Sequence, residues 1–241
     1  MEIGEEGFAP QKKVKYMTKL SKRMKAIKKS VDASKVYTIS EAVKILKEMP
    51  AVKFDASIEA HVSLGIDPKK GEQIVRSTVI LPHGNGKIKR LVAFTTKTQE
   101  AKSVGADIIG DDEYIEKIRK TGKCDFDIAV ATPEMMAKIA PIAKILGQKG
   151  LMPNPKSGTI DNDIEKMIKE LKAGKESFKN DDSANVHLAV GKISFDDNKL
   201  VENIIAFIEA IKKAKPQSLK GTYIKSIALS STMGPGLKIT L

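Results

Sequence analysis

The chain has 241 residues, of which 41% are hydrophobic and 30% charged, and its formal net charge is +12. This composition excludes an intrinsically disordered chain and is sufficient for one large domain or two small ones. The positive charge favours a polyanionic partner, because clustered lysines and arginines release the counterions that are condensed on nucleic acid. No apolar stretch approaches membrane-spanning length, and the single Cys124 excludes an intrachain disulfide, which is typical of a reducing cytosol.

The excess positive charge is concentrated near the N-terminus. Residues 12–29 contain nine lysines and arginines and no acid, and apolar residues recur among them at helical spacing. This pattern predicts a basic amphipathic helix, and residues 1–19 are assigned to a basic N-terminal extension. Three interpretations stay open: a helix packed on the body with its lysines toward RNA, a helix on a membrane surface, and a solvated arm.

A short helix and two strands are predicted next. Thr38 and Glu41 have the spacing of a capping box, and Pro50 ends the helix that follows. Residues 58–66 alternate between apolar and polar, which is the pattern of a strand with one buried face, and a second strand is expected over residues 73–81. Such alternation favours a partly open antiparallel sheet.

The pattern changes after residue 81. Continuous apolar runs alternate with helix-like segments from Leu91 to Leu146, which is typical of a parallel sheet covered on both faces. Beyond a second region rich in glycine and proline, the alternating pattern resumes. In this last region we predict helices over 161–172 and 196–214, a hairpin near Asp181 and a strand over 221–227.

We therefore predict an α/β (α+β) fold class with two domains. A split α+β domain with an antiparallel sheet is formed by both termini, over residues 20–83 and 158–241. A Rossmann-like three-layer α/β domain is inserted at residues 84–157. The two crossings, near 82–86 and 147–158, are expected to act as hinges at four residues: Pro82, Gly84, Gly86 and Gly158.

No motif predicts catalysis, a metal or a cofactor. None of the four Gly-Lys pairs is followed by the Ser or Thr of a nucleotide-binding phosphate loop. His61, His83 and His187 lack metal-ligand spacing, and Gly84 to Gly86 lacks the third glycine of a dinucleotide fingerprint. We therefore expect that the protein is not an enzyme. The disfavoured alternative is an enzyme that acts on a small molecule in the α/β domain, which requires a ligand at the carboxyl ends of the strands.

The C-terminal region has the chemistry of an RNA contact. From Ala210 to the end there are six lysines and no acid. Residues 230–236 place hydroxyls, a thioether and bare backbone on one predicted tight loop. Such a loop can press against a sugar-phosphate surface.

Three motifs carry a family resemblance: this loop, residues 145–156 (ILGQKGLMPNPK) and residues 53–59 (KFDASIE). The chain closely resembles ribosomal protein L-one of the bacterial type from about Leu20 to its end. The resemblance implies a cytoplasmic, ribosome-associated protein, monomeric when free, that binds 23S-type rRNA at the mobile stalk of the large subunit. It also implies a role in release of deacylated tRNA from the exit site and repression of translation through its own operon mRNA. A free-standing mRNA-binding repressor is the alternative.

The resemblance also assigns roles to particular residues. Phe54 and Met233 are expected to lie against ribose or base faces, although each can instead fill a core. Lys149 and Lys156 are expected to make secondary contacts with RNA or tRNA. Gln148-Lys149 stands where the family usually has Pro-Arg, so a planar, bidentate contact of arginine with phosphate is replaced by the point charge of lysine. The resemblance maps rRNA contacts onto Lys53, Phe54, Ser57, Thr232, Met233 and Gly234. We expect Lys192, Lys225 and Ser230 to contact rRNA as well.

Overall fold

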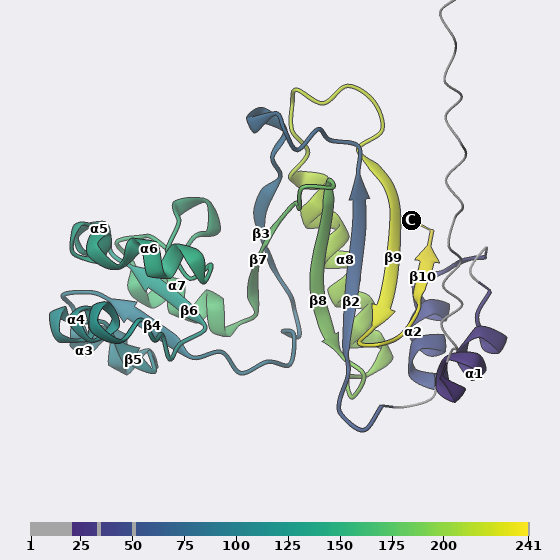
Figure 1. The fold of residues 1–241 in the computed structure, drawn as a ribbon, viewed down its shortest axis with the longest axis horizontal. Helices are drawn as coiled ribbons and strands as arrows, with labels where there is room; N and C mark the ends of the chain where they lie inside the picture. Colours follow the sequence, from purple (N-terminus) through teal and green to yellow (C-terminus); the bar gives the residue numbers. More distant parts are fainter. Residues whose placement is uncertain (1–20, 33–34, 50–51, 241) are drawn as a thin grey trace, which may run out of the picture.

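The computed structural model describes residues 21–32, 35–49 and 52–240, which form two domains (Figure 1). A large sheet lies at one end of the molecule and a smaller α/β unit lies at the other. A two-stranded ribbon, β3 (Arg76–Ile80) and β7 (Lys175–Lys179), lies between them. Within the described ranges, none of the helices combines the length and the hydrophobicity that spanning a membrane requires.

The N-terminal elements are α1 (Lys22–Ser30), β1 (Val36–Tyr37) and α2 (Ile39–Glu48). The first half of the helix predicted over residues 12–29 lies outside the described residues, and α1 is its described part. The capping box of α2 is confirmed, since the Thr38 backbone N–H donates to Glu41 Oε2 at 3.1 Å and the Glu41 N–H donates to Thr38 Oγ1 at 3.3 Å. These two bonds satisfy backbone donors that the first turn leaves open.

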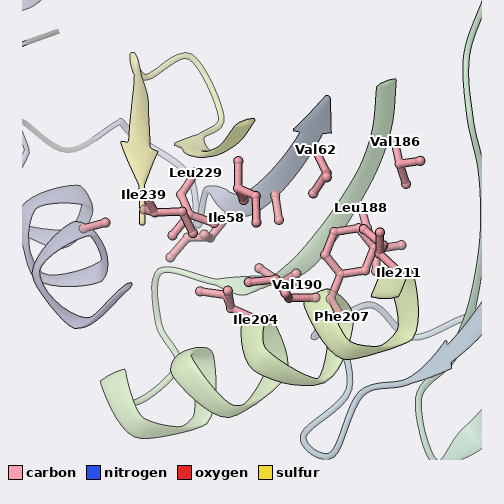
Figure 2. Packing of buried hydrophobic residues seen from close by; sticks show 14 of the residues in the cluster. Ile58, Val62, Val186, Leu188, Val190, Ile204, Phe207, Ile211, Leu229 and Ile239 are labelled. Carbon is pink, nitrogen blue, oxygen red and sulfur yellow. The ribbon is translucent and has the colours of Figure 1, made fainter. Parts of the chain in front are cut away.

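The large sheet combines strands from both ends of the chain. Its order is β1-β10-β9-β2-β8, and all neighbours are antiparallel except β1 and β10. Helices α2 and α8 (Asp197–Lys213) pack on it, and Figure 2 shows Val190 facing Ile204 and Phe207 of α8. The split α+β domain is thereby confirmed; its other strands are β2 (Ser57–Leu64), β8 (Asn185–Lys192), β9 (Ile224–Ser231) and β10 (Gly236–Ile239).

The strand expected over residues 73–81 does not join the large sheet. A turn of 3-10 helix, η1 (Gly71–Gln73), precedes β3 (Arg76–Ile80), which pairs antiparallel with β7 (Lys175–Lys179) as a separate ribbon. The ribbon still belongs to the core of the split domain, because Phe178 of β7 packs edge-on against Phe207 of α8. The alternation of apolar and polar residues predicts which face of this strand is buried, but it does not predict which strand pairs with it.

The inserted unit has three parallel strands in the order β5-β4-β6. Separate apolar clusters cover its two faces, which confirms the Rossmann-like three-layer domain. The helical segment over residues 133–148 is interrupted, because Pro141 has no backbone N–H to donate. The elements are β4 (Leu91–Phe94), α3 (Thr98–Ser103), β5 (Ile108–Ile109), α4 (Asp112–Thr121), β6 (Ile128–Ala131), α5 (Pro133–Ile139), η2 (Ala140–Ile142), α6 (Ala143–Gln148), η3 (Pro155–Ser157) and α7 (Ile164–Lys172).

Helix α7 packs with the inserted unit, although residues 158–241 were expected in the split domain. Ile164, Met167 and Ile168 of α7 share an apolar cluster with Leu91 and Val130 of the parallel sheet. The helical pattern predicted which face of α7 is buried, but it carries no information on which sheet that face covers.

The two chain crossings meet at Gly174. The Leu81 N–H donates to the Gly174 carbonyl at 3.1 Å, so the predicted crossing near Pro82 to Gly86 lies at this point. Gly158 lies elsewhere: it ends η3, and the segment after it joins the parallel sheet, where the Ala131 N–H donates to the Thr159 carbonyl at 3.0 Å. The second crossing is therefore not at residues 147–158.

Candidate nucleic-acid interface

Two segments that are distant in sequence meet at one end of the large sheet. Strands β2 and β9 pair with Ile58 opposite Ser231, which brings the segment before β2 beside the loop after β9. The Thr232 N–H donates to the Ser57 carbonyl at 2.9 Å, and the Ser57 N–H donates to Thr232 Oγ1 at 3.1 Å. These bonds join the two segments into one rim.

The loop after β9 is a tight turn that projects Met233. The Gly234 N–H donates to the Ser231 carbonyl at 2.7 Å, and Met233 has a φ of 62°, in the left-handed region. Its side chain is 71% exposed, so Met233 does not fill a core. A Cβ at Gly234 would lie 2.3 Å from Ser231 Oγ and 3.1 Å from the Ser231 carbonyl oxygen, so a side chain there would displace the Ser231 hydroxyl. The predicted strand 221–227 is instead 224–231, so the loop begins only at Thr232.

The segment before β2 adds an aromatic ring and cations. Phe54 is 55% exposed, which excludes a core role, and Lys53 is exposed beside it. Lys192 lies opposite Ser57 in the pairing of β8 with β2. We call this set the recognition rim: Lys53, Phe54, Ser57, Lys192, Thr232, Met233 and Gly234.

A carboxylate that was not predicted as a site residue supports the rim. Asp55 Oδ2 lies 3.7 Å from Lys192 Nζ and accepts a hydrogen bond from Ser194 Oγ at 2.9 Å. The Ser194 N–H also donates to Asp55 Oδ1, at 3.3 Å. Asp55 therefore joins the turn after β8 to the segment that carries Phe54. Its place in the KFDASIE motif was visible, but its bond to Ser194, 139 residues away, was not.

Ser230 lies next to the rim and is engaged by a histidine pair on the sheet face opposite α8. Ser230 Oγ lies 2.9 Å from His61 Nε2, and His61 Nδ1 lies 2.8 Å from His187 Nδ1. Burial, followed by the charge of His187, lowers the pKa of His61, and nearby Glu59 acts in the opposite direction. One Nδ1 must donate and the other accept, so the bond requires one of these nitrogens to be unprotonated.

Three lysines predicted to contact RNA lie apart from the rim. Lys225 is near the opposite end of β9, seven residues from Thr232, or roughly 23 Å along a strand. Lys149 and Lys156 are exposed in the inserted domain, where Lys149 Nζ donates to the Gly122 carbonyl at 2.9 Å. Lys149 and Lys156 were expected from their motif and Lys225 from the lysine-rich tail, but the sequence did not predict their separation from the rim.

A cavity between the domains lies at the amino ends of the parallel strands. It has a volume of about 380 Å³ and is lined by Leu91 and Ile128, the first residues of β4 and β6. A ligand of a Rossmann-like domain binds at the carboxyl ends of the strands, which is the opposite edge. Among residues 21–32, 35–49 and 52–240, no group of three or more His, Cys, Asp and Glu side chains is placed to hold a metal ion.

The chain is a two-domain protein in which a split α+β domain carries an exposed rim of Phe, Met and lysine and is joined to an inserted α/β domain. The model of the Ribosomal protein L1p/L10e family matches residues 46–235. Large ribosomal subunit protein uL1 of Protochlamydia amoebophila is 52% identical over 227 residues, covering 93% of this chain and 96% of the relative. The protein of the same name from Kosmotoga olearia is 48% identical over 225 residues, covering 92% and 97%. The chain therefore belongs to the Ribosomal protein L1p/L10e family.

Proposed function

We propose that this protein is a structural, non-enzymatic component of the large ribosomal subunit, and that it binds the large-subunit rRNA through the recognition rim. The observation that carries the proposal is the joining of two distant segments, with Phe54 and Met233 both exposed. Relatives about half identical to this chain are named as large-subunit proteins. In this role the protein works in the cytoplasm with the ribosome.

The rim residues have different parts in this proposal. The Thr232 hydroxyl is occupied by the backbone of Ser57, so Thr232 holds the rim together. Phe54 and Met233 offer flat or polarisable surfaces to ribose and base faces, and Lys53 and Lys192 offer charge to phosphates. Gly234 lets RNA approach the backbone closely.

Binding of the full-length protein to large-subunit and small-subunit rRNA tests the proposal. We expect selective binding of the large-subunit rRNA that falls steeply as salt rises. Phe54→Ala and Met233→Ala should each lose about 1 to 3 kcal/mol, or roughly 5- to 150-fold in affinity. Ile205→Ala removes an exposed apolar side chain on α8 and should leave affinity unchanged. Equal affinity of the wild-type protein for both rRNAs would contradict the proposal.

A second role follows if the rim also accepts the operon mRNA of the protein. RNA recognised by shape and 2′-hydroxyls can be replaced by another RNA of the same local structure. We expect Met233→Ala to relieve repression of a reporter that carries the operon leader, and large-subunit rRNA to compete with the leader. If the Met233→Ala variant still repressed the reporter fully, the operon mRNA would bind to another surface of the protein.

The inserted domain is the proposed site of contact with exit-site tRNA. Lys149 and Lys156 are exposed there, away from the rim. We place this domain at about residues 87–173, with hinges at 82–86 and at Gly174, which are the segments that cross between the two domains. Replacing both lysines by Gln should slow release of deacylated tRNA from ribosomes while rRNA binding is retained. Unchanged release would exclude these lysines.

A further inference from the structure

Helix α1 lies against the loop that carries Met233. Arg23 Nη2 donates to the Met233 carbonyl at 2.7 Å, across 210 residues of sequence. The helix is anchored independently of this bond, because Ile27 is 1% exposed and Met24 packs against the same core. The Ser21 side chain caps the helix by accepting from the Met24 N–H at 3.3 Å.

The Met233 backbone needs external support. A left-handed conformation costs an L-residue about 1 to 2 kcal/mol and persists where the surroundings impose it. The Gly234 and Thr232 bonds fix the residues on either side, and Arg23 fixes the carbonyl of Met233 itself. The guanidinium carries a positive charge, so this hydrogen bond is charge-assisted.

The same helix brings further charge to the rim. Lys22 and Lys25 flank Arg23 within the first turn of α1, both are exposed, and the first turn contains no acid. Lysine binds phosphate as a mobile point charge. Arg23 contacts the rim directly, so this end of α1, with its two exposed lysines, lies beside the rim.

We propose that Arg23 is a positioning residue that holds Met233 in its RNA-binding conformation, and that Lys22 and Lys25 extend the RNA contact to neighbouring phosphates. This inference rests on the proposed rRNA binding and deepens it. It assigns two separable roles to one basic helix: Arg23 acts through a carbonyl, and the lysines act on the RNA itself.

Salt dependence separates the two roles. The probe is the fragment of large-subunit rRNA that the full-length wild-type protein protects from nuclease. We expect Arg23→Gln to weaken binding about tenfold without changing the slope of log affinity against log salt, because Arg23 releases no counterion. The Lys22→Gln/Lys25→Gln double variant should reduce the magnitude of that slope by about 0.7 to 0.9 for each phosphate that the variant no longer neutralises.

A double-mutant cycle tests the route through Met233. Arg23→Gln should cost less than half as much in a Met233→Ala background, because residues that act as one unit are not additive. Lys213→Gln is the charge-matched control. Lys213 is exposed at the C-terminal end of α8, whereas the rim residue Lys192 precedes the N-terminal end of this helix at Asp197, roughly 24 Å away along the helix. It should change neither affinity nor slope beyond error.

Each outcome bears on a different claim. If the wild-type protein fails to select large-subunit rRNA, the proposed function is wrong. If it binds but Arg23→Gln binds equally, or lowers the salt slope, the positioning role is wrong. An unchanged slope for the lysine variant overturns the phosphate contact. Arg23→Lys, which keeps the charge and a donor, should recover part of the affinity and provides a second variant if Arg23→Gln fails to fold.

Discussion

At the scale of the residue, Met233 combines backbone strain with exposure. Glycine adopts positive φ at little cost, so Met233→Gly should raise the free energy of unfolding by about 0.5 to 1 kcal/mol. The same change removes the exposed thioether side chain and should weaken rRNA binding by at least fivefold. Urea denaturation and RNA titration of the same preparation measure both effects.

Ala184 provides a control for this exchange. It has a φ of 63°, is the other non-glycine residue with positive φ in the described part of the chain, and lies in the turn between β7 and β8. Ala184→Gly should leave rRNA affinity unchanged; its gain in stability should be smaller, because the Ala184 methyl is buried in the core. A Met233→Gly protein that is less stable than wild type would show that the φ of Met233 stores no strain.

The burial of His61 should make the stability of the protein depend on pH. Burial and the charge of His187 lower the pKa of His61 below its ordinary 6.5, so the unfolded chain binds this proton more tightly than the folded protein does. The free energy of unfolding should therefore fall as pH decreases from about 7 to 5. Two carboxylates lie near the histidines: Glu59 is 4.0 Å from His61, and Asp181 is 3.5 Å from His187. The negative charge of Glu59 favours protonated His61 and therefore limits the loss of stability.

Replacement of His61 by glutamine tests this origin. The variant has no titrating group at this position, so its stability should change less between about pH 7 and 5 than that of wild type. His83→Gln is the matched control, because His83 lies outside the sheet and interacts with Glu202 at 2.6 Å. If the free energy of unfolding of the His61 variant fell as much as that of wild type, the pH dependence would arise from other groups.

At the scale of the element, one buried amide joins α8 to its neighbours. Asn203 is 0% exposed; its Nδ2 donates to the Gly84 carbonyl at 2.9 Å and the Val190 carbonyl at 2.8 Å, and its Oδ1 accepts from the His83 N–H at 3.1 Å. The side chain thus holds β8 and the first crossing against the helix. Removing one partner from a buried hydrogen bond costs more than the bond contributes, because the remaining group loses water as well.

Asn203→Ala should therefore lower the free energy of unfolding by about 2 to 4 kcal/mol, since three backbone groups lose their partner. Asn198→Ala, on the exposed side of the same helix, should change it by less than about 0.5 kcal/mol. Urea denaturation measures both. A small effect at Asn203 would show that water replaces the amide in the variant.

Local patterns explain which elements the sequence predicted. The alternation over residues 58–66, the capping box at Thr38 and the helix near 196–214 depend on neighbours within a few residues, and all three are present in the structure. The sheet that α7 covers and the ribbon that β3 joins depend on contacts across the fold, which no local period encodes.

The same distinction applies to the recognition rim. Phe54 and Met233 were predicted because their motifs resemble a known family, and the structure brings their segments together. Asp55 acts through a residue 139 positions away and Arg23 through one 210 positions away, so neither had a sequence signal for its role. Lys225 shares the composition of the tail but lies near the far end of β9, because position along a strand cannot be inferred from charge.

At the scale of the whole molecule, the two domains are connected where Gly174 meets the first crossing. Gly174 has a φ of 100°, and a Cβ there would lie 2.8 Å from the Leu81 carbonyl oxygen and 2.9 Å from Gly84 Cα. Both obstacles are backbone atoms, which cannot move aside as a flexible side chain can. Salt bridging also occurs here, between Lys89 and Glu176.

Gly174→Ala should therefore destabilise the protein by more than about 1 kcal/mol and alter the separation of the domains, measured by urea denaturation and by the radius of gyration in X-ray scattering. Gly147→Ala lies in α6, in the region where the second hinge was expected, and its Cβ would meet nothing within 4 Å. As an Ala for Gly exchange within a helix, it should stabilise by about 0.5 to 1 kcal/mol and leave the domain separation unchanged. If Gly147→Ala altered the separation and Gly174→Ala did not, the second hinge would belong near residue 147, as the glycine and proline pattern had indicated. The reverse result would support a crossing that joins the domains only through the segments around Leu81 and Gly174.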